Sequence, residues 1–103
     1  MTPSSIEAAA TALVEARRSR TLLTSLPADI VPPTTADGYA VQSAFMKLWG
    51  DKVAGWKIGA TAKPLLDKFG LREPFAGPFF VSDVAASPAR PLAAEHPHLC
   101  IEA

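Results

Sequence analysis

The segment Gly55–Thr61, which reads Gly-Trp-Lys-Ile-Gly-Ala-Thr, constrains the fold of this chain more than any other stretch. Alternate side chains of a strand project to opposite faces. A strand from Val53 to Ala60 would therefore place Trp56 and Ile58 on one face and the central lysine, with a glycine on each side, on the other. The sequence thus predicts one apolar face and one face of bare backbone that carries a single ammonium group.

The glycine-lined face of this predicted strand favours an anionic ligand. Gly55 and Gly59 have no side chain, so a ligand can approach the backbone closely and meet the charge of Lys57. The competing interpretation is a solvated lysine on the outer face of an edge strand. Spacing alone leaves both interpretations open.

The charge balance argues against one class of partner. Ten Lys and Arg balance ten Asp and Glu, and the longest basic block, Arg17–Arg20, is interrupted by a serine. Because nucleic-acid binding needs a concentrated positive face, we expect no nucleic-acid partner.

Length and cysteine usage bound the class of protein. A chain of 103 residues with 49% hydrophobic content is one small domain or a part of a larger one. The single cysteine, Cys100, excludes an intrachain disulfide and fits a reducing compartment. No apolar run approaches the ~20 residues of a membrane span. We therefore expect a cytoplasmic protein with no membrane partner.

A first helix is expected near the start of the chain. Apolar residues at helical spacing predict it from about Ser4 to Leu23. Its starting point is open, because Ser4 and Glu7 form a capping-box pattern while Thr2-Pro3 places a proline at the first helical position.

A second helix is expected over Ala36–Leu48, where apolar residues recur at helical spacing. Thr34 or Thr35 supplies its cap, and Gly50 is placed to end it. Three prolines make residues 26–33 a connector between the two helices.

The helix and strand expected in the second half of the chain are shorter than the two helices of the first half. A helix over Lys63–Phe69 would be capped by Thr61 and stopped by Gly70 in the left-handed conformation. Phe79–Val81 is a plausible strand. Residues 82–98 show no periodicity and are expected to form a long surface connection.

Arginines cluster at the end of the first predicted helix, at Arg17, Arg18 and Arg20. The cluster could bind a carboxylate or phosphate of a partner. The alternative is a solvated helix end whose cations suit the helix dipole.

Potential metal ligands recur at every second position near the end of the sequence: His96, His98, Cys100 and Glu102. Imidazole, thiolate and carboxylate groups are zinc ligands. Side chains from consecutive same-side positions of one strand run parallel instead of converging, so an ordinary strand entering a sheet is the competing interpretation. Glu102 in such an apolar strand would be costly to bury without a cation or hydrogen bonds.

Five segments in a fixed order carry a resemblance: Ala16–Arg18, Ala36–Gln42, Gly55–Thr61, Gly70–Pro74 with Gly77 after it, and Ile101–Ala103. Together they cover nearly the whole chain. In this order they resemble the N-terminal part of the 2-keto-4-pentenoate hydratase family, within the fumarylacetoacetate hydrolase superfamily.

Members of that family hydrate a 2-hydroxy-2,4-dienoate to a 4-hydroxy-2-oxo acid during meta-cleavage breakdown of aromatic compounds. The resemblance implies a small 2-oxo or 2-hydroxydienoate acid as the substrate, and Mg²⁺ or Mn²⁺ held by carboxylates as the cofactor. It implies that Lys57 is catalytic, that Lys57 and Gly59 bind the substrate, and that Glu102 is the first metal ligand.

The resemblance also implies an α+β fold. Residues 1–81 would form an N-terminal α/β subdomain, and residues 82–103 the connector and first strand of a β-rich catalytic domain. The family's second glutamate would follow Ala103, so we expect an N-terminal portion that is inactive by itself and binds no metal tightly. Phe75 stands where hydratases of the family often carry an aspartate, which leaves hydratase, decarboxylase and hydrolase chemistry open.

The alternative to an enzyme is a stand-alone, non-catalytic α/β module that binds a partner or assembles with itself. If the chain is instead the N-terminal portion of the hydratase, apolar side chains at Phe75, Phe79, Phe80 and Ile101 lie where the missing domain would cover them. Because large exposed apolar patches promote association, we expect the isolated chain to form a homo-oligomer.

Overall fold

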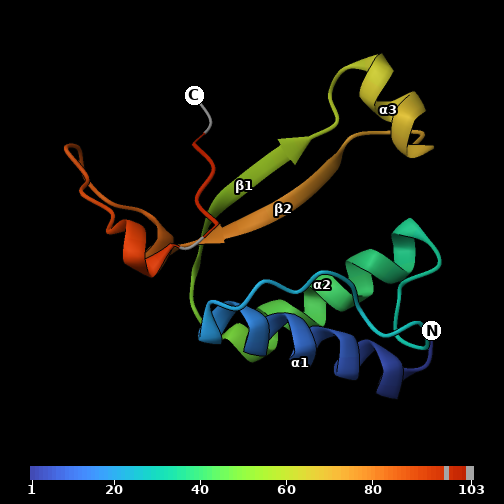
Figure 1. The fold of residues 1–103 in the computed structure, drawn as a ribbon. Helices are drawn as coiled ribbons and strands as arrows, with labels where there is room; N and C mark the ends of the chain where they lie inside the picture. The colour runs from blue at the N-terminus through green and yellow to red at the C-terminus, as the bar shows by residue number, and fades with distance from the viewer. Residues whose placement is uncertain (97, 102–103) are drawn as a thin grey trace. The chain divides into compact units, whose positions relative to one another are not determined.

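The computed structural model describes residues 1–96 and 98–101 and has an α+β fold, as predicted (Figure 1). The described residues contain three helices, a two-stranded antiparallel sheet and two short 3-10 turns. They divide into two compact units, residues 51–87 and the rest of the chain, which are described separately below. No helix in the described part is long and apolar enough to cross a membrane.

The first unit is built on a pair of packed helices, α1 (Pro3–Ser19) and α2 (Thr35–Trp49). Ala9, Ala10 and Val41 are buried at the centre of their contact. Two of these three side chains are single methyl groups, which let the helix backbones approach closely. Partly buried side chains from both helices and from the connector surround this centre: Met1, Ile6, Leu13, Leu26, Ile30, Ala44 and Phe45.

The start of α1 follows the Thr2-Pro3 alternative. The hydroxyl of Thr2 accepts from the amide of Ser5 at 3.1 Å, and the hydroxyl of Ser5 accepts from the amide of Thr2 at 2.9 Å. This reciprocal pair is a capping box. The predicted box of Ser4 with Glu7 is therefore wrong, because helix formation has already begun at Pro3.

Both helices end at residues in the left-handed conformation. Helix α1 stops at Ser19 rather than at Leu23, because Arg20 adopts φ 55° and turns the chain. Helix α2 ends as predicted at Gly50, with φ 75° and an amide that donates to Met46 at 3.2 Å. Its cap is Thr34, whose hydroxyl accepts from the amide of Asp37 at 3.1 Å.

The second unit is a β-hairpin whose two strands, β1 (Val53–Gly59) and β2 (Phe75–Phe80), are joined through helix α3 (Lys63–Phe69). Strand β1 stops one residue earlier than predicted, because Ala60 has φ 54°. Strand β2 begins at Phe75 rather than at Phe79. Pro78 lies inside it, which is compatible with a two-stranded sheet because both strands are edges.

Helix α3 has the predicted bounds but not the predicted cap. Ala62 occupies the cap position and supplies no side-chain hydrogen bond, so the assignment of Thr61 is wrong. Gly70 ends the helix with φ 63°, as predicted, and the amide of Leu71 donates to the carbonyl of Leu66 at 2.9 Å.

The described part of the chain after Asp83 carries little regular structure, in agreement with the expected surface connection. Its one helical turn is Ala93–Glu95. The strand expected at the C-terminal end is not present over Leu99–Ile101, and Glu102 and Ala103 lie outside the described residues. The domain boundary expected after Val81 stays a prediction.

Candidate functional site

Lys57 lies in the middle of β1 and is exposed. In the antiparallel register it pairs with Gly77, while Gly55 pairs with Phe79 and Gly59 with Phe75. Residues directly opposite each other in an antiparallel pair share a face of the sheet. The lysine therefore shares its face with two phenylalanines, one in each direction along β2.

The glycine positions are not bare backbone, contrary to the expectation from the sequence. A Cβ atom built on Gly55 would lie 2.4 Å from Cζ of Phe79, and one built on Gly59 would lie 2.7 Å from Cζ of Phe75. Both distances are far shorter than a van der Waals contact, so each ring occupies the space that a side chain would need. The glycines do permit close approach, but the approaching groups are the two rings of the partner strand.

The resulting surface combines one cation with two aromatic rings. Phe75 and Phe79 are 44% and 39% exposed, so their rings are accessible as well as packed on the glycines. An ammonium group attracts a carboxylate, and aromatic faces pack against flat apolar groups. This face, composed of Lys57, Phe75, Gly77 and Phe79, is called the lysine face below. It suits a small, flat, conjugated acid.

The opposite face of the hairpin is apolar. Trp56 pairs with Pro78, and Ile58 pairs with Ala76. Trp56 is 50% exposed and Ile58 is 55% exposed. This face, called the tryptophan face below, leaves about half of each of these two side chains exposed to solvent.

Two aspartates that the sequence analysis did not single out fix the end of the hairpin. Asp51, just before β1, accepts from the Ser82 hydroxyl at 2.6 Å and the Ser82 amide at 3.0 Å. These hydrogen bonds hold the pKa of the Asp51 carboxyl below its usual value. Asp83 accepts from the amide of Phe80 at 3.0 Å. The sequence signal for both was the position of a turn-forming Asp beside a strand end.

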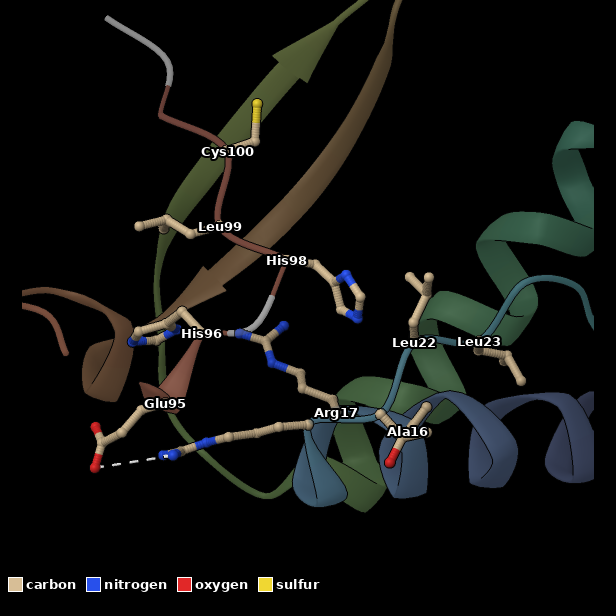
Figure 2. Close-up of a pocket in the computed structure, with 11 residues that line it drawn as sticks. Ala16, Arg17, Leu22, Leu23, Glu95, His96, His98, Leu99 and Cys100 are labelled. Carbon is tan, nitrogen blue, oxygen red and sulfur yellow. Dashed lines mark ion pairs between the residues drawn. The ribbon is translucent and has the colours of Figure 1, made fainter. Parts of the chain in front are cut away.

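Of the four potential metal ligands near the end of the sequence, three line a pocket and the fourth lies outside the described residues. His96, His98 and Cys100 line one pocket with Arg17 and Arg20, in the first unit (Figure 2). Over residues 1–96 and 98–101, no three His, Cys, Asp or Glu side chains are grouped so that they could hold a metal ion. The predicted metal ligand Glu102 lies outside this part of the chain.

Comparison with family models, with curated proteins and with solved structures finds no match to this chain.

Proposed function

We propose that this chain is the N-terminal part of a divalent-metal-dependent hydratase that adds water to 2-hydroxy-2,4-dienoates, in meta-cleavage catabolism of aromatic compounds. The observation that supports the proposal is the lysine face. Lys57 stands opposite Gly77, and a phenylalanine ring covers each glycine that flanks it in the strand. One cation beside two flat apolar groups matches a substrate that is both anionic and conjugated.

In this proposal Lys57 binds the negative charge of the substrate. The carboxylate stays charged throughout, and negative charge builds on the 2-oxygen when the dienol loses its hydroxyl proton on the way to the keto form. An ammonium close to these oxygens stabilises that dienolate. Phe75 and Phe79 pack against the diene carbons and exclude water from that side, which orients the substrate for addition at one end.

The metal is a separate question, because its proposed first ligand, Glu102, lies outside the described residues. Magnesium and manganese sites need several oxygen ligands. The described residues offer no group of three acidic, histidine or cysteine side chains, so they do not form such a site by themselves. We therefore assign no step to the metal.

The binding part of the proposal can be tested on this chain. The probe is 2-oxopentanoate, a stable 2-oxo acid, titrated into ¹⁵N-labelled protein and followed by the amide signals of Gly59 and Gly77. Both signals should shift in a saturable manner. The shifts should be lost in Lys57→Met and retained in Lys52→Met, which removes the same charge just outside the strand. Identical behaviour of the two variants, or no shift at all, would refute a role of the lysine face in binding acids.

The alternative function, a non-catalytic binding or assembly module, draws on a different observation. Trp56 and Ile58 are half exposed on the tryptophan face. An apolar surface of this kind is typical of protein contact sites. The DNA that follows the codon for Ala103 distinguishes the two: an open reading frame that continues into a second glutamate favours the hydratase, and an immediate stop codon favours the module.

A further inference from the structure

A groove in the first unit is lined by both helices of the pair, α1 and α2, which lie side by side in Figure 1. Its volume is about 490 Å³, and it is called the helix groove below. The wall on α1 contains Pro3, Ile6 and Glu7, and the wall on α2 comes from residues 40–48. The groove thus lies wholly within the part of the chain that forms the helix pair.

The uncharged lining of the helix groove is mostly apolar. Ile6 and Ala44 pack against the buried centre of the helix pair, and Leu48 is 40% exposed. Ser43 is polar, but its hydroxyl donates to the Tyr39 carbonyl of its own helix at 2.9 Å. Because that hydroxyl is already hydrogen-bonded, this part of the surface can be buried without leaving it unsatisfied.

The connector between the helices does not close the helix groove. Leu26 and Ile30 pack against the buried centre of the pair. Residues 26–33 are all described, and none of them lines the groove. The connector therefore leaves this apolar surface available to a partner.

The two helices run in the same direction. At their start, the N-terminal nitrogen of Met1 lies 3.0 Å from the carboxylate of Asp37. At their end, the Arg18 guanidinium donates to the carbonyl of Leu48 at 3.1 Å. A residue early in α1 and a residue late in α2 are therefore far apart along the groove.

The charged residues of the helix groove have opposite signs and lie toward its opposite ends. Glu7 is in the first half of α1, and Lys47 is in the last turn of α2. Both are exposed, and neither forms an ion pair with another residue that the structure describes. A surface with this charge pattern is complementary to a copy of itself turned end to end.

We propose that the helix groove is the contact between two copies of this chain, related by a two-fold axis through its middle. A two-fold interface uses the same surface of both subunits, so each contact occurs twice. Glu7 then meets Lys47 of the partner subunit, and Lys47 meets Glu7 of the partner subunit. The apolar linings are buried between these two charge pairs, as in protein interfaces with an apolar centre and a polar rim. The inference does not depend on the lysine face.

Sedimentation velocity measures the dissociation constant of this dimer. The 103-residue chain carries Trp56→Ser and Ile58→Thr, so that the tryptophan face does not contribute. Glu7→Lys and Lys47→Glu each replace two attractive contacts by two repulsive ones, and each should weaken the dimer at least about 10-fold. An equimolar mixture of the two variants should form a heterodimer about as tight as the dimer without them, because opposite charges meet again at both ends.

Matched controls separate the groove from general effects of charge and apolar surface. Asp29→Lys makes the same change of charge as Glu7→Lys, at an exposed position of the connector, and should leave the dissociation constant unchanged. Leu48→Ala should weaken the dimer at least about 5-fold, since the truncated side chain occurs twice in the interface. Val31→Ala, which shortens an exposed side chain of the connector, should have no effect.

Three results would overturn the inference. The first is a chain that stays monomeric at high concentration in the Trp56→Ser and Ile58→Thr background. The second is equal weakening by Glu7→Lys and Asp29→Lys, which would show that only net charge matters. The third is a mixture of Glu7→Lys and Lys47→Glu chains that associates no more tightly than either variant alone, with both variants folded by far-UV circular dichroism.

Discussion

The ring of Phe79 covers Gly55, with its Cζ atom 2.4 Å from the place that a Cβ atom would occupy. A side chain at position 55 must therefore displace the ring or bend the strand. We expect Gly55→Ala to lower the free energy of unfolding by about 1 kcal/mol, the low end of the cost of overpacking, because the Phe79 ring is 39% exposed and can turn aside. Urea denaturation measures the change.

Gly38→Ala is the matched control for this glycine. Gly38 lies in α2, and nothing is within 4 Å of a Cβ built on it. Alanine is the better helix former, so the control should raise the free energy of unfolding by up to about 1 kcal/mol. Equal effects of the two substitutions would show that the Phe79 ring does not lie over the strand.

The cap of α2 gives a second prediction. Thr34→Ala removes the hydroxyl that accepts from the Asp37 amide, and should cost about 1 kcal/mol of stability. Thr35→Ala changes the neighbouring threonine, which is the first helical residue, and should be neutral or slightly stabilising. Thermal unfolding of the two variants compares them directly. A larger loss of stability from Thr35→Ala than from Thr34→Ala would show that Thr35, and not Thr34, caps the helix.

The Asp51–Ser82 contact predicts a pH dependence. Hydrogen bonds from Ser82 lower the pKa of Asp51 in the folded state below the reference value of 3.8. Its carboxylate therefore stabilises the fold at pH values above the reference, and this contribution is lost as the pH falls through the lowered pKa. Stability measured from pH 6 down to pH 2 should fall less in Asp51→Asn than in the parent.

Asp29→Asn is the control for that titration. Asp29 is exposed, and its substitution removes the same charge as Asp51→Asn does. It should follow the pH profile of the parent chain. An Asp51→Asn profile that also coincides with the parent would contradict the Asp51–Ser82 contact.

The tryptophan face predicts self-association. The double variant Trp56→Ser with Ile58→Thr removes the two half-exposed side chains of this face and should lower the average mass measured by light scattering at high concentration. Val84→Ser removes a side chain that is 58% exposed, outside the strands, and should leave the mass unchanged. A monomeric parent chain that binds no hydrophobic dye would contradict the prediction.

Local signals in the sequence were sufficient for much of the fold. Gly50 and Gly70 ended their helices as predicted, because a residue in the left-handed conformation is needed there and glycine adopts it without strain. Arg20 shows the limit of this rule. It adopts the same conformation without being glycine, and so α1 ended earlier than its sequence indicated.

The composition of the lysine face could not be predicted in full from the local sequence. The alternation around Lys57 correctly predicted which residues share its face of β1. What covers Gly55 and Gly59 is decided by the register with β2, a pairing between residues about twenty positions apart. The early start of β2 was missed because Gly77 and Pro78 are typical of turns, although an edge strand tolerates both.

Turnover by the native protein that carries this chain is the decisive measurement for the proposal that Lys57 acts on a 2-hydroxy-2,4-dienoate. Hydration is followed by loss of the dienol absorbance in the presence of Mg²⁺, with Lys52→Ala as the control. We expect Lys57→Ala to lower kcat at least about 100-fold, within the range for loss of one electrostatic group at a reacting centre, with Mg²⁺ affinity nearly unchanged. Full activity in Lys57→Ala, or a parent protein that does not hydrate the dienoate, would contradict it.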